Sequence, residues 1–234
     1  MMTPPGAMDL SRFRALATDY DGTLAHDGAV RESTLAALER LKGAGYRLLL
    51  VTGRVVHELV ATFPDYRVFD LIVAENGALL FDPESQKAEL LGARPPSSFI
   101  AALYDRVLPL QTGHAIVATW EPHEKAVLET IKEMGLELQV IFNKGAVMIL
   151  PSGVNKATGL KAALRHFEID PSDVVGIGDA ENDHALLEAC GLAVAVSNAL
   201  PSLKEKAHLV TEADHGDGVV ELIDRLLALP AAAR

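Results

Sequence analysis

Cysteine is almost absent from this 234-residue chain, which contains only Cys190. A single thiol cannot form an intramolecular disulfide, nor can it build a zinc or iron–sulfur site that needs several cysteines. The eight histidines include no pair at the spacing of a zinc motif. We therefore expect Cys190 to serve as a small apolar packing residue rather than as a reactive thiol.

Long apolar runs and basic runs are also missing. No stretch approaches the ~18 apolar residues of a membrane-spanning helix, and residues 1–8 lack the apolar segment of a signal peptide. The chain has 21 Lys and Arg against 32 Asp and Glu, a net charge of −11. We predict a cytoplasmic protein with neither a membrane nor a nucleic-acid partner, since nucleic-acid binding normally requires a basic patch. A small anion could still bind where local cations or a metal ion compensate its charge.

The composition that remains is that of an ordinary globular protein, with 49% hydrophobic and 23% charged residues. Short β-like runs alternate with amphipathic helical runs, which predicts an α/β fold with a parallel sheet. Between residues 83 and 152 the pattern changes, and Asn143-Lys144-Gly145 predicts a hairpin within an antiparallel sheet. We predict a flexible tail at 1–11, a core formed by 12–82 and 153–230, and a smaller inserted α/β domain at 83–152.

Two aspartates follow the first predicted strand, Arg14–Thr18. Asp19 and Asp21 stand two positions apart, so extended chain can point both side chains the same way. Gly22 would let the chain turn sharply behind them. Close carboxylates repel each other unless a cation or a proton lies between them. The pair is consistent with a cation site, although a solvated acidic loop is the commoner explanation of a lone Asp-x-Asp pattern.

Two further signals suit an anion. Thr52 and Gly53 come directly after the predicted strand Arg47–Val51, and free backbone N–H groups at such a helix start can hold an oxyanion. Lys156 stands at the beginning of a predicted helix, where its charge opposes the helix dipole. A phosphate held between the lysine and the helix end would remove that conflict. A helix N-cap and a solvated surface lysine are the alternatives.

The fourth signal is another pair of acidic residues. The apolar strand predicted at Val174–Gly178 delivers Asp179, and a tight turn brings Asp183 back near it. Carboxylates at this spacing suit a hard cation such as Mg²⁺, which uses few protein ligands and keeps several waters. The alternative is a capped helix start with Asp183 at or near the cap.

Together these signals resemble the motifs of the haloacid dehalogenase superfamily of phosphotransferases, in the family order. They are Asp-x-Asp-Gly-Thr-Leu at Asp19–Leu24, then Thr52, then Lys156, then Gly-Asp-x-x-Asn-Asp at Gly178–Asp183. The Ala74–Ala78 stretch and the insertion between Thr52 and Lys156 resemble the Cof-like subgroup, whose members carry an α/β cap there. The resemblance implies a Rossmann-like core and a Mg²⁺-dependent phosphatase. Its substrate would be a small phosphorylated metabolite, such as a sugar phosphate or phosphoglycolate.

The resemblance also implies roles for individual residues. Asp19 would attack phosphorus and form an aspartyl-phosphate, and Asp21 would act as general acid and then general base. The implied phosphate-binding residues are Thr52, Gly53, Lys156 and Asn182, with Asn182 orienting either Lys156 or the phosphate. The implied Mg²⁺ ligands are Asp19, Asp21 through its backbone carbonyl, Asp179 and Asp183, the last directly or through water.

Residues outside the motifs carry weaker expectations. Arg54 is expected to cover the surface rather than to add a cation to the site. In the inserted cap, the candidates for substrate selection are Trp120, His114, Asn143 and Lys144. A tryptophan that ends a strand is more often a core residue, and the polar candidates are more often solvated.

Two other functions share some of these features. A phosphomutase of the same superfamily would keep every motif but transfer the phosphate to another substrate hydroxyl, so release of inorganic phosphate distinguishes the two. A non-catalytic receiver-like or phosphometabolite-binding module would also combine acids, a threonine and a lysine. The length of the chain, its inserted cap and the intact Asp19 and Asp21 argue against such a module.

Overall fold

The computed structural model describes residues 10–228. Residues 1–9 of the predicted tail therefore lie outside the described part, as do the last two residues of the predicted core range. Leu10 and Ser11, the other two residues of that predicted tail, begin a short 3-10 helix at Leu10–Arg12. This end of the segment is folded rather than a tail.

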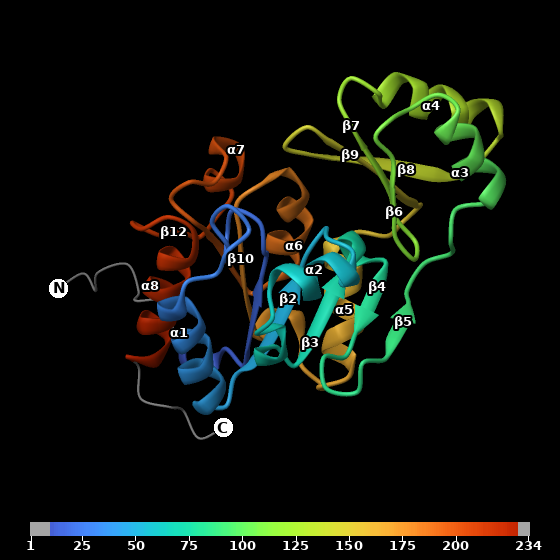
Figure 1. Cartoon of the computed structure of the whole chain (residues 1–234). Helices are drawn as coiled ribbons and strands as arrows, with labels where there is room; N and C mark the ends of the chain where they lie inside the picture. The colour runs from blue at the N-terminus through green and yellow to red at the C-terminus, as the bar shows by residue number, and fades with distance from the viewer. Residues whose placement is uncertain (1–9, 229–234) are drawn as a thin grey trace.

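Within residues 10–228 the larger sheet has eight strands in the order β12-β11-β10-β1-β2-β3-β4-β5 (Figure 1). Neighbours from β12 to β3 pair in parallel, while β4 and β5 join antiparallel at the edge. The strand bounds are β1 Ala15–Thr18, β2 Arg47–Val51, β3 Leu71–Ala74, β4 Leu79–Phe81, β5 Ala88–Leu90, β10 Val174–Gly178, β11 Leu192–Ala195 and β12 Leu209–Val210. The predicted α/β class with a parallel core sheet is confirmed.

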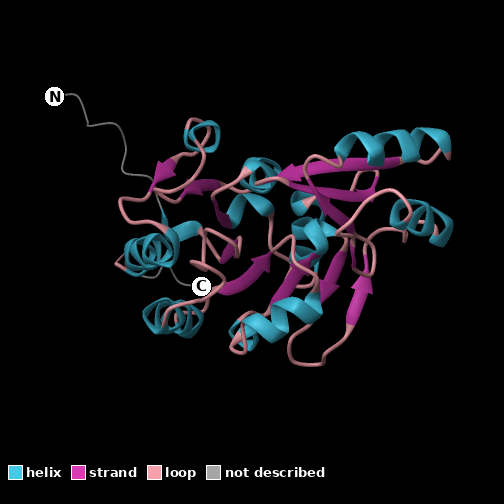
Figure 2. Cartoon of the chain, turned by 45° about the horizontal axis from the view of Figure 1, so that its top comes forward, coloured by secondary structure: helices cyan, strands magenta, loops and turns pink. Residues whose placement is uncertain are grey.

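Helices cover both faces of this sheet (Figure 2). Because strand side chains alternate, Leu48 and Leu50 pack in one apolar cluster with α1 and α8, whereas Leu49 and Val51 pack in another with α5 and α6. Burial on both sides explains why the central strands are continuous apolar runs. The helix bounds in the core are α1 Glu32–Gly43, α2 Val56–Thr62, α5 Lys156–Arg165, α6 His184–Ala189, α7 Pro201–Lys204 and α8 His215–Leu227.

A second, smaller unit is inserted between β5 and α5 and stands at the upper right of Figure 1. In the described range its antiparallel sheet has the order β6-β7-β9-β8, with strands β6 Gln111–Thr112, β7 Val117–Trp120, β8 Leu138–Asn143 and β9 Ala146–Pro151. Its helices α3 (Ser97–Tyr104) and α4 (Glu124–Glu133) pack on one face through a cluster that includes Phe99 and Val127. The hairpin predicted at Asn143-Lys144-Gly145 joins β8 to β9.

The start of the inserted unit differs from the predicted residue 83. Strand β5 lies inside the range 83–152, yet it pairs with β4 and extends the larger sheet. Its three residues are exposed, so no apolar pattern distinguishes it in the sequence, and only pairing with the buried β4 makes it a strand. We therefore propose that the cap begins after Leu90 rather than at residue 83.

The turn between β3 and β4 fastens the cap to the core. This turn is the 3-10 segment Glu75–Gly77, and Glu75 in it is fully buried. The Glu75 carboxylate accepts hydrogen bonds from the backbone N–H groups of His114 (2.8 Å), Ala115 (2.7 Å) and Ile116 (3.0 Å) at the root of β7. An apolar cluster containing Val55 from the core and Met148 from the cap continues the contact.

None of the helices formed by residues 10–228 has the length and apolarity required to cross a membrane. Cys190 is buried, and its burial raises the pKa of its thiol to about 12. Its sulfur packs against Gly176 in β10, as an apolar packing residue would.

Candidate active site

The predicted site residues lie where the chain reverses direction across the larger sheet. From β1 the chain moves outward through β2 and β3, and it returns on the other side of β1 as β10. Ligands of open α/β sheets bind at the carboxyl ends of strands at such a switch point. Asp19 directly follows β1, Thr52 follows β2 and Asp179 follows β10, so the topology gathers three of the four sequence signals at one edge.

Three carboxylates meet there. Asp19, Asp179 and Asp183 each offer an oxygen, and these oxygens lie within 4.8 Å of one another. All three residues are buried. Burial, together with repulsion from Asp183 and Asp179, raises the pKa of Asp19 to about 8 although Lys156 opposes the shift. Burial also raises the pKa of Asp179. An additional cation would favour the ionised form of both groups.

Lys156 supplies a buried positive charge to the site. It begins α5, as predicted, and its side chain has no exposed surface. Its Nζ donates to Oδ1 of Asp19 at 2.5 Å and to Oδ1 of Asp183 at 2.7 Å. Burial alone would lower the lysine pKa, but the two carboxylates outweigh it and the net shift is upward. Lys156 is therefore a permanently charged ammonium ion rather than a solvated surface lysine.

Asp183 combines the two interpretations that the sequence allowed. Its Oδ1 accepts from Lys156, and its Oδ2 accepts from the backbone N–H groups of Asp179 (2.9 Å) and Ala180 (3.1 Å). It thus shapes the loop after β10 while belonging to the carboxylate cluster. A Cβ on Gly178 would approach the Asp183 side chain to 2.6 Å, so this close packing requires glycine.

Asp21 points to a different partner from Asp19. The Nε and Nη2 of Arg54 donate to its two carboxylate oxygens, each at 2.7 Å, and the guanidinium lies 5.1 Å from the centre of the Tyr20 ring. The carboxylate of Asp21 is outside the three-carboxylate cluster, and its backbone carbonyl oxygen lies 3.4 Å from Nζ of Lys144. The expectation that Arg54 merely covers the surface is wrong, because it forms a two-pronged contact with a predicted catalytic residue.

The predicted phosphate-binding residues lie beside this cluster. The hydroxyl of Thr52 is buried and accepts a bond from the Arg54 N–H at 3.1 Å, which leaves its own hydrogen to donate. Among residues 10–228, the N–H of Gly53 has no protein acceptor. Of the two roles predicted for Asn182, a hydrogen bond to Lys156 is not formed among the described residues. Its amide donates instead to Oδ1 of Asn76 at 3.1 Å, beside Thr52 and Gly53, so the role of orienting the phosphate stays a prediction.

One cap residue enters the site. Lys144, at the tip of the β8–β9 hairpin, places Nζ 2.5 Å from Oδ2 of Asp179 and 3.4 Å from the carbonyl oxygen of Asp21. The other cap candidates lie differently. Trp120 is 42% exposed and is not a core residue, and the His114 ring contacts Glu75 at 3.1 Å.

Three residues near the site were not singled out as functional in the sequence. Thr23 donates to Oδ1 of Asp179 at 3.3 Å, and it belongs to the motif around Asp19. Glu75 and Asn76 stand in the stretch that suggested the Cof-like subgroup. The signal available in the sequence was that two polar residues directly follow an apolar strand; the structure shows that both are buried.

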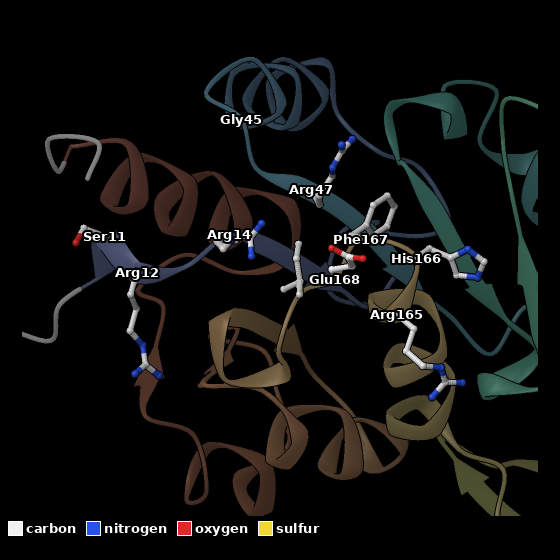
Figure 3. Close-up of a pocket in the computed structure, with 10 residues that line it drawn as sticks. Ser11, Arg12, Arg14, Gly45, Arg47, Arg165, His166, Phe167 and Glu168 are labelled. Carbon is white, nitrogen blue, oxygen red and sulfur yellow. The ribbon is translucent and has the colours of Figure 1, made fainter. Parts of the chain in front are cut away.

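A surface pocket of about 790 Å³ lies elsewhere (Figure 3). Arg14 and Arg47 on its wall precede or begin β1 and β2, so it opens at the amino ends of strands whose carboxyl ends carry the site. Arg47 is bound to Asp70, and Glu168 adds a carboxylate to the wall. The pocket is therefore separate from the carboxylate cluster.

The profile of the haloacid dehalogenase-like hydrolases matches residues 16–101 and 113–223, which is most of the chain and includes every site residue described above. The chain belongs to this family. The resemblance drawn from the motifs is confirmed, and with it the prediction that the protein is a hydrolase.

Relatives and solved structures of this family span nearly the whole chain. A phosphoglycolate phosphatase of Methanothermobacter thermautotrophicus is 33% identical over 221 residues, covering 92% of this chain and 99% of the relative. Phosphoglycolate phosphatase 2 of Saccharolobus solfataricus is 29% identical, covering 91% and 92%.

Two structures show the same fold of core and cap. A haloacid dehalogenase-like hydrolase from Bacteroides thetaiotaomicron superposes with a TM-score of 0.75 at 20% identity, covering 92% of this chain and 99% of its own. A sugar phosphatase of haloacid dehalogenase subclass IIB gives a TM-score of 0.72 at 22% identity, covering 92% and 100%.

Proposed function

We propose that this haloacid dehalogenase-like hydrolase is a Mg²⁺-dependent phosphatase of small phosphorylated metabolites that acts through an aspartyl-phosphate. One observation carries the proposal: a buried aspartate at the end of β1, Asp19, lies between the ammonium of Lys156 and the carboxylate of Asp179. The printed activities of relatives, phosphoglycolate phosphatase and sugar phosphatase, agree with it.

The donor set fits a magnesium ion. Carboxylate and carbonyl oxygens are the ligands that Mg²⁺ prefers. Burial, together with the nearby Asp183 and Asp179, raises the pKa of Asp19 to about 8 even with Lys156 beside it, so a further cation would be favourable there. We propose Asp19, Asp179 and the Asp21 carbonyl as ligands, with Asp183 behind them because its oxygens are held by the fully buried Lys156 and by two backbone N–H groups of its own loop. When bound, Mg²⁺ would neutralise charge on the transferring phosphoryl group and keep Asp19 ionised.

Asp19 is proposed as the nucleophile. Its carboxylate oxygen would form a bond to phosphorus while the bond from phosphorus to the leaving oxygen breaks, which splits the hydrolysis into two easier steps. Lys156 would hold a phosphoryl oxygen in addition to its present carboxylate partners. The free hydrogen of the Thr52 hydroxyl and the free N–H of Gly53 would donate to the remaining oxygens.

Asp21 is proposed to transfer the protons. It would protonate the leaving oxygen in the first step and take a proton from the attacking water in the second, which releases inorganic phosphate and restores Asp19. To donate its proton, Asp21 must release one of the two Arg54 contacts. Arg54 is thus proposed as the residue that positions this acid.

The test is a phosphate-release assay over phosphorylated metabolites, including phosphoglycolate and hexose phosphates, with and without Mg²⁺. We expect Mg²⁺-dependent release from at least one of them. Full activity in excess chelator would contradict the metal role. Conversion of one phosphate ester into another without release of inorganic phosphate would identify a phosphomutase instead.

A further inference from the structure

The cap contributes one cation to the catalytic centre. Lys144 lies in the tight turn between β8 and β9, with φ of +47° at Lys144 and +83° at Gly145. Its Nζ is 2.5 Å from Oδ2 of Asp179, and 46% of its side chain is exposed. Among the described residues it is the one lysine or arginine of the cap that pairs with a carboxylate of the site.

The other two cations at the site are already committed. Lys156 is fully buried and holds Asp19 and Asp183, while both prongs of Arg54 are taken by Asp21. Lys144 is also paired, but with one carboxylate only and with 46% of its side chain exposed, so it is the cation that a second negative charge of a substrate, besides its phosphate, can reach. Glu181, whose carboxylate lies 3.4 Å from the Lys144 backbone N–H, is the nearby acid that would oppose such a charge.

The cap is held so that the hairpin tip stays over the site. Glu75 binds three consecutive backbone N–H groups at the root of β7, and Met148 of β9 packs on Gly53. Lys144 is only two residues from β9 in sequence and cannot leave the neighbourhood without moving the hairpin. Its flexible side chain can still reorient, because half of it is in solvent.

The carboxylate of Asp179 cannot bind a metal ion and keep its present contact with the Lys144 ammonium at the same time. Lys144 would have to leave Oδ2 of Asp179 if a divalent cation were bound by Asp19 and Asp179, because like charges repel. Its ammonium would stay on the cap side of the carboxylates, opposite Lys156 and the strand ends, so a leaving group that points toward the cap would meet it.

We propose that Lys144 is the residue that determines specificity: it recognises a negative charge on the leaving group, and so favours phosphate monoesters of small hydroxy acids, the class for which the phosphoglycolate phosphatases among the relatives are named, over esters of neutral alcohols or sugars. This inference rests on the proposed phosphatase function. Because Lys144 contacts Asp179 in the structure, it would compete with a metal ion for that carboxylate.

A matched pair of substrates tests the charge directly. Phosphoglycolate and 2-hydroxyethyl phosphate have the same two-carbon leaving group, ending in a carboxylate in the first and a neutral hydroxyl in the second. We expect kcat/KM of the parent enzyme to favour phosphoglycolate. In Lys144→Met the ratio of the two kcat/KM values should fall on the order of 30-fold, the size of a charge-assisted contact.

Two further variants control for charge and for the cap. Lys144→Arg, which keeps the charge, should retain most of the preference. Lys125→Met removes an 84% exposed lysine from α4 of the same cap and should leave the ratio unchanged. Equal losses on both substrates in Lys144→Met would overturn the proposal. If the parent enzyme releases phosphate from no ester at all, it is the proposed phosphatase function that fails.

Metal binding supplies a readout that does not depend on turnover. Titration with Mn²⁺, followed by electron paramagnetic resonance, should show tighter binding to Lys144→Met than to the parent by about three- to tenfold, since no ammonium competes for Asp179. Unchanged or weaker Mn²⁺ binding would contradict the resting contact between Lys144 and Asp179.

Discussion

The chemical properties of single residues in this protein depend on the residues that surround them. Asp19 and Asp21 are two positions apart, yet one is buried between Lys156 and two carboxylates while the other is held at the surface side by Arg54. These different surroundings suit the two tasks that we propose for the same side-chain type, attack on phosphorus and proton transfer.

Replacing Asp19 with asparagine tests the nucleophile. We expect Asp19→Asn to lower kcat by at least about a thousandfold, because a neutral amide cannot form the aspartyl-phosphate. The fold should survive, since the amide oxygen can still accept from Lys156 and the repulsion with Asp183 and Asp179 is relieved. Phosphate release and thermal denaturation are the measurements. Asp65→Asn, at an exposed position, is the control. Turnover within tenfold of the parent, with deamidation excluded, would refute the assignment.

Arg54 can be tested through the leaving group. Arg54→Lys keeps the charge but loses the two-pronged contact with Asp21, so protonation of the leaving oxygen should suffer. For an alkyl phosphate, kcat/KM should fall about 10- to 100-fold, the usual contribution of general acid catalysis or somewhat less. For nitrophenyl phosphate, whose leaving group needs no proton, the loss should be much smaller. A uniform loss on both esters would mean that Arg54 does not position the acid.

At the scale of elements, the turn Glu75–Gly77 does more than reverse the chain between β3 and β4. Asn76 has φ of +55°, and Gly77, with φ of +104°, packs so closely on the backbone at Asn155 that no Cβ would fit. The same turn bonds Thr52 through the Asn76 N–H (2.9 Å) and the cap through Glu75. One short segment thus connects the end of β2 at Thr52, the start of α5 and the cap.

Removing the charge of Glu75 tests this connection. In Glu75→Gln one oxygen acceptor becomes an NH₂ donor facing backbone N–H groups, which should cost about 2–3 kcal/mol of stability. Amide hydrogen exchange at Ala115 and Ile116 should accelerate more than exchange in β1 or β2. Glu89→Gln, on the exposed strand β5, is the matched control. Unchanged protection at Ala115 and Ile116 would show that Glu75 does not hold the cap.

At the scale of the whole molecule, the burial of several carboxylates together in an acidic protein is electrostatically unfavourable. The chain carries a net charge of −11 and buries three carboxylates together at one sheet edge. In the metal-free protein the folded-state pKa of Asp19, about 8, exceeds its ordinary value of 3.8. The folded state therefore holds a proton that the unfolded state has lost, so this group's contribution to stability falls as pH rises from about 4 through 8.

A divalent cation should reverse that loss. Because protons compete with Mg²⁺ for Asp19, we expect 10 mM Mg²⁺ to raise Tm more at pH 8.5 than at pH 6. A shift of about 5 °C at the higher pH would correspond to saturation near 100 times Kd. Differential scanning calorimetry with and without chelator measures it. Asp179→Asn should lose most of the shift. An equal shift at both pH values would contradict proton competition at Asp19.

The sequence predicted the local features of the fold well. Continuous apolar runs marked the central strands, and Asn143-Lys144-Gly145 marked a hairpin that the structure confirms. These signals are legible because each depends on neighbouring residues only. Strand β5 was missed because its three residues are exposed and its existence depends on a partner strand.

The site divides in the same way. The motifs and the resemblance nominated Asp19, Lys156 and Asp179 from their positions after strands or at a helix start, and the parallel topology brought these residues together. Which atoms meet was decided by the tertiary structure alone: Lys156 and Asp19 are 137 positions apart, Arg54 and Asp21 are 33 apart, and Lys144 and Asp179 are 35 apart. A local sequence pattern indicates on which face of a strand or helix a side chain lies. The partner of a buried charge depends on how separate strands and the cap pack, and desolvation makes that choice energetically decisive.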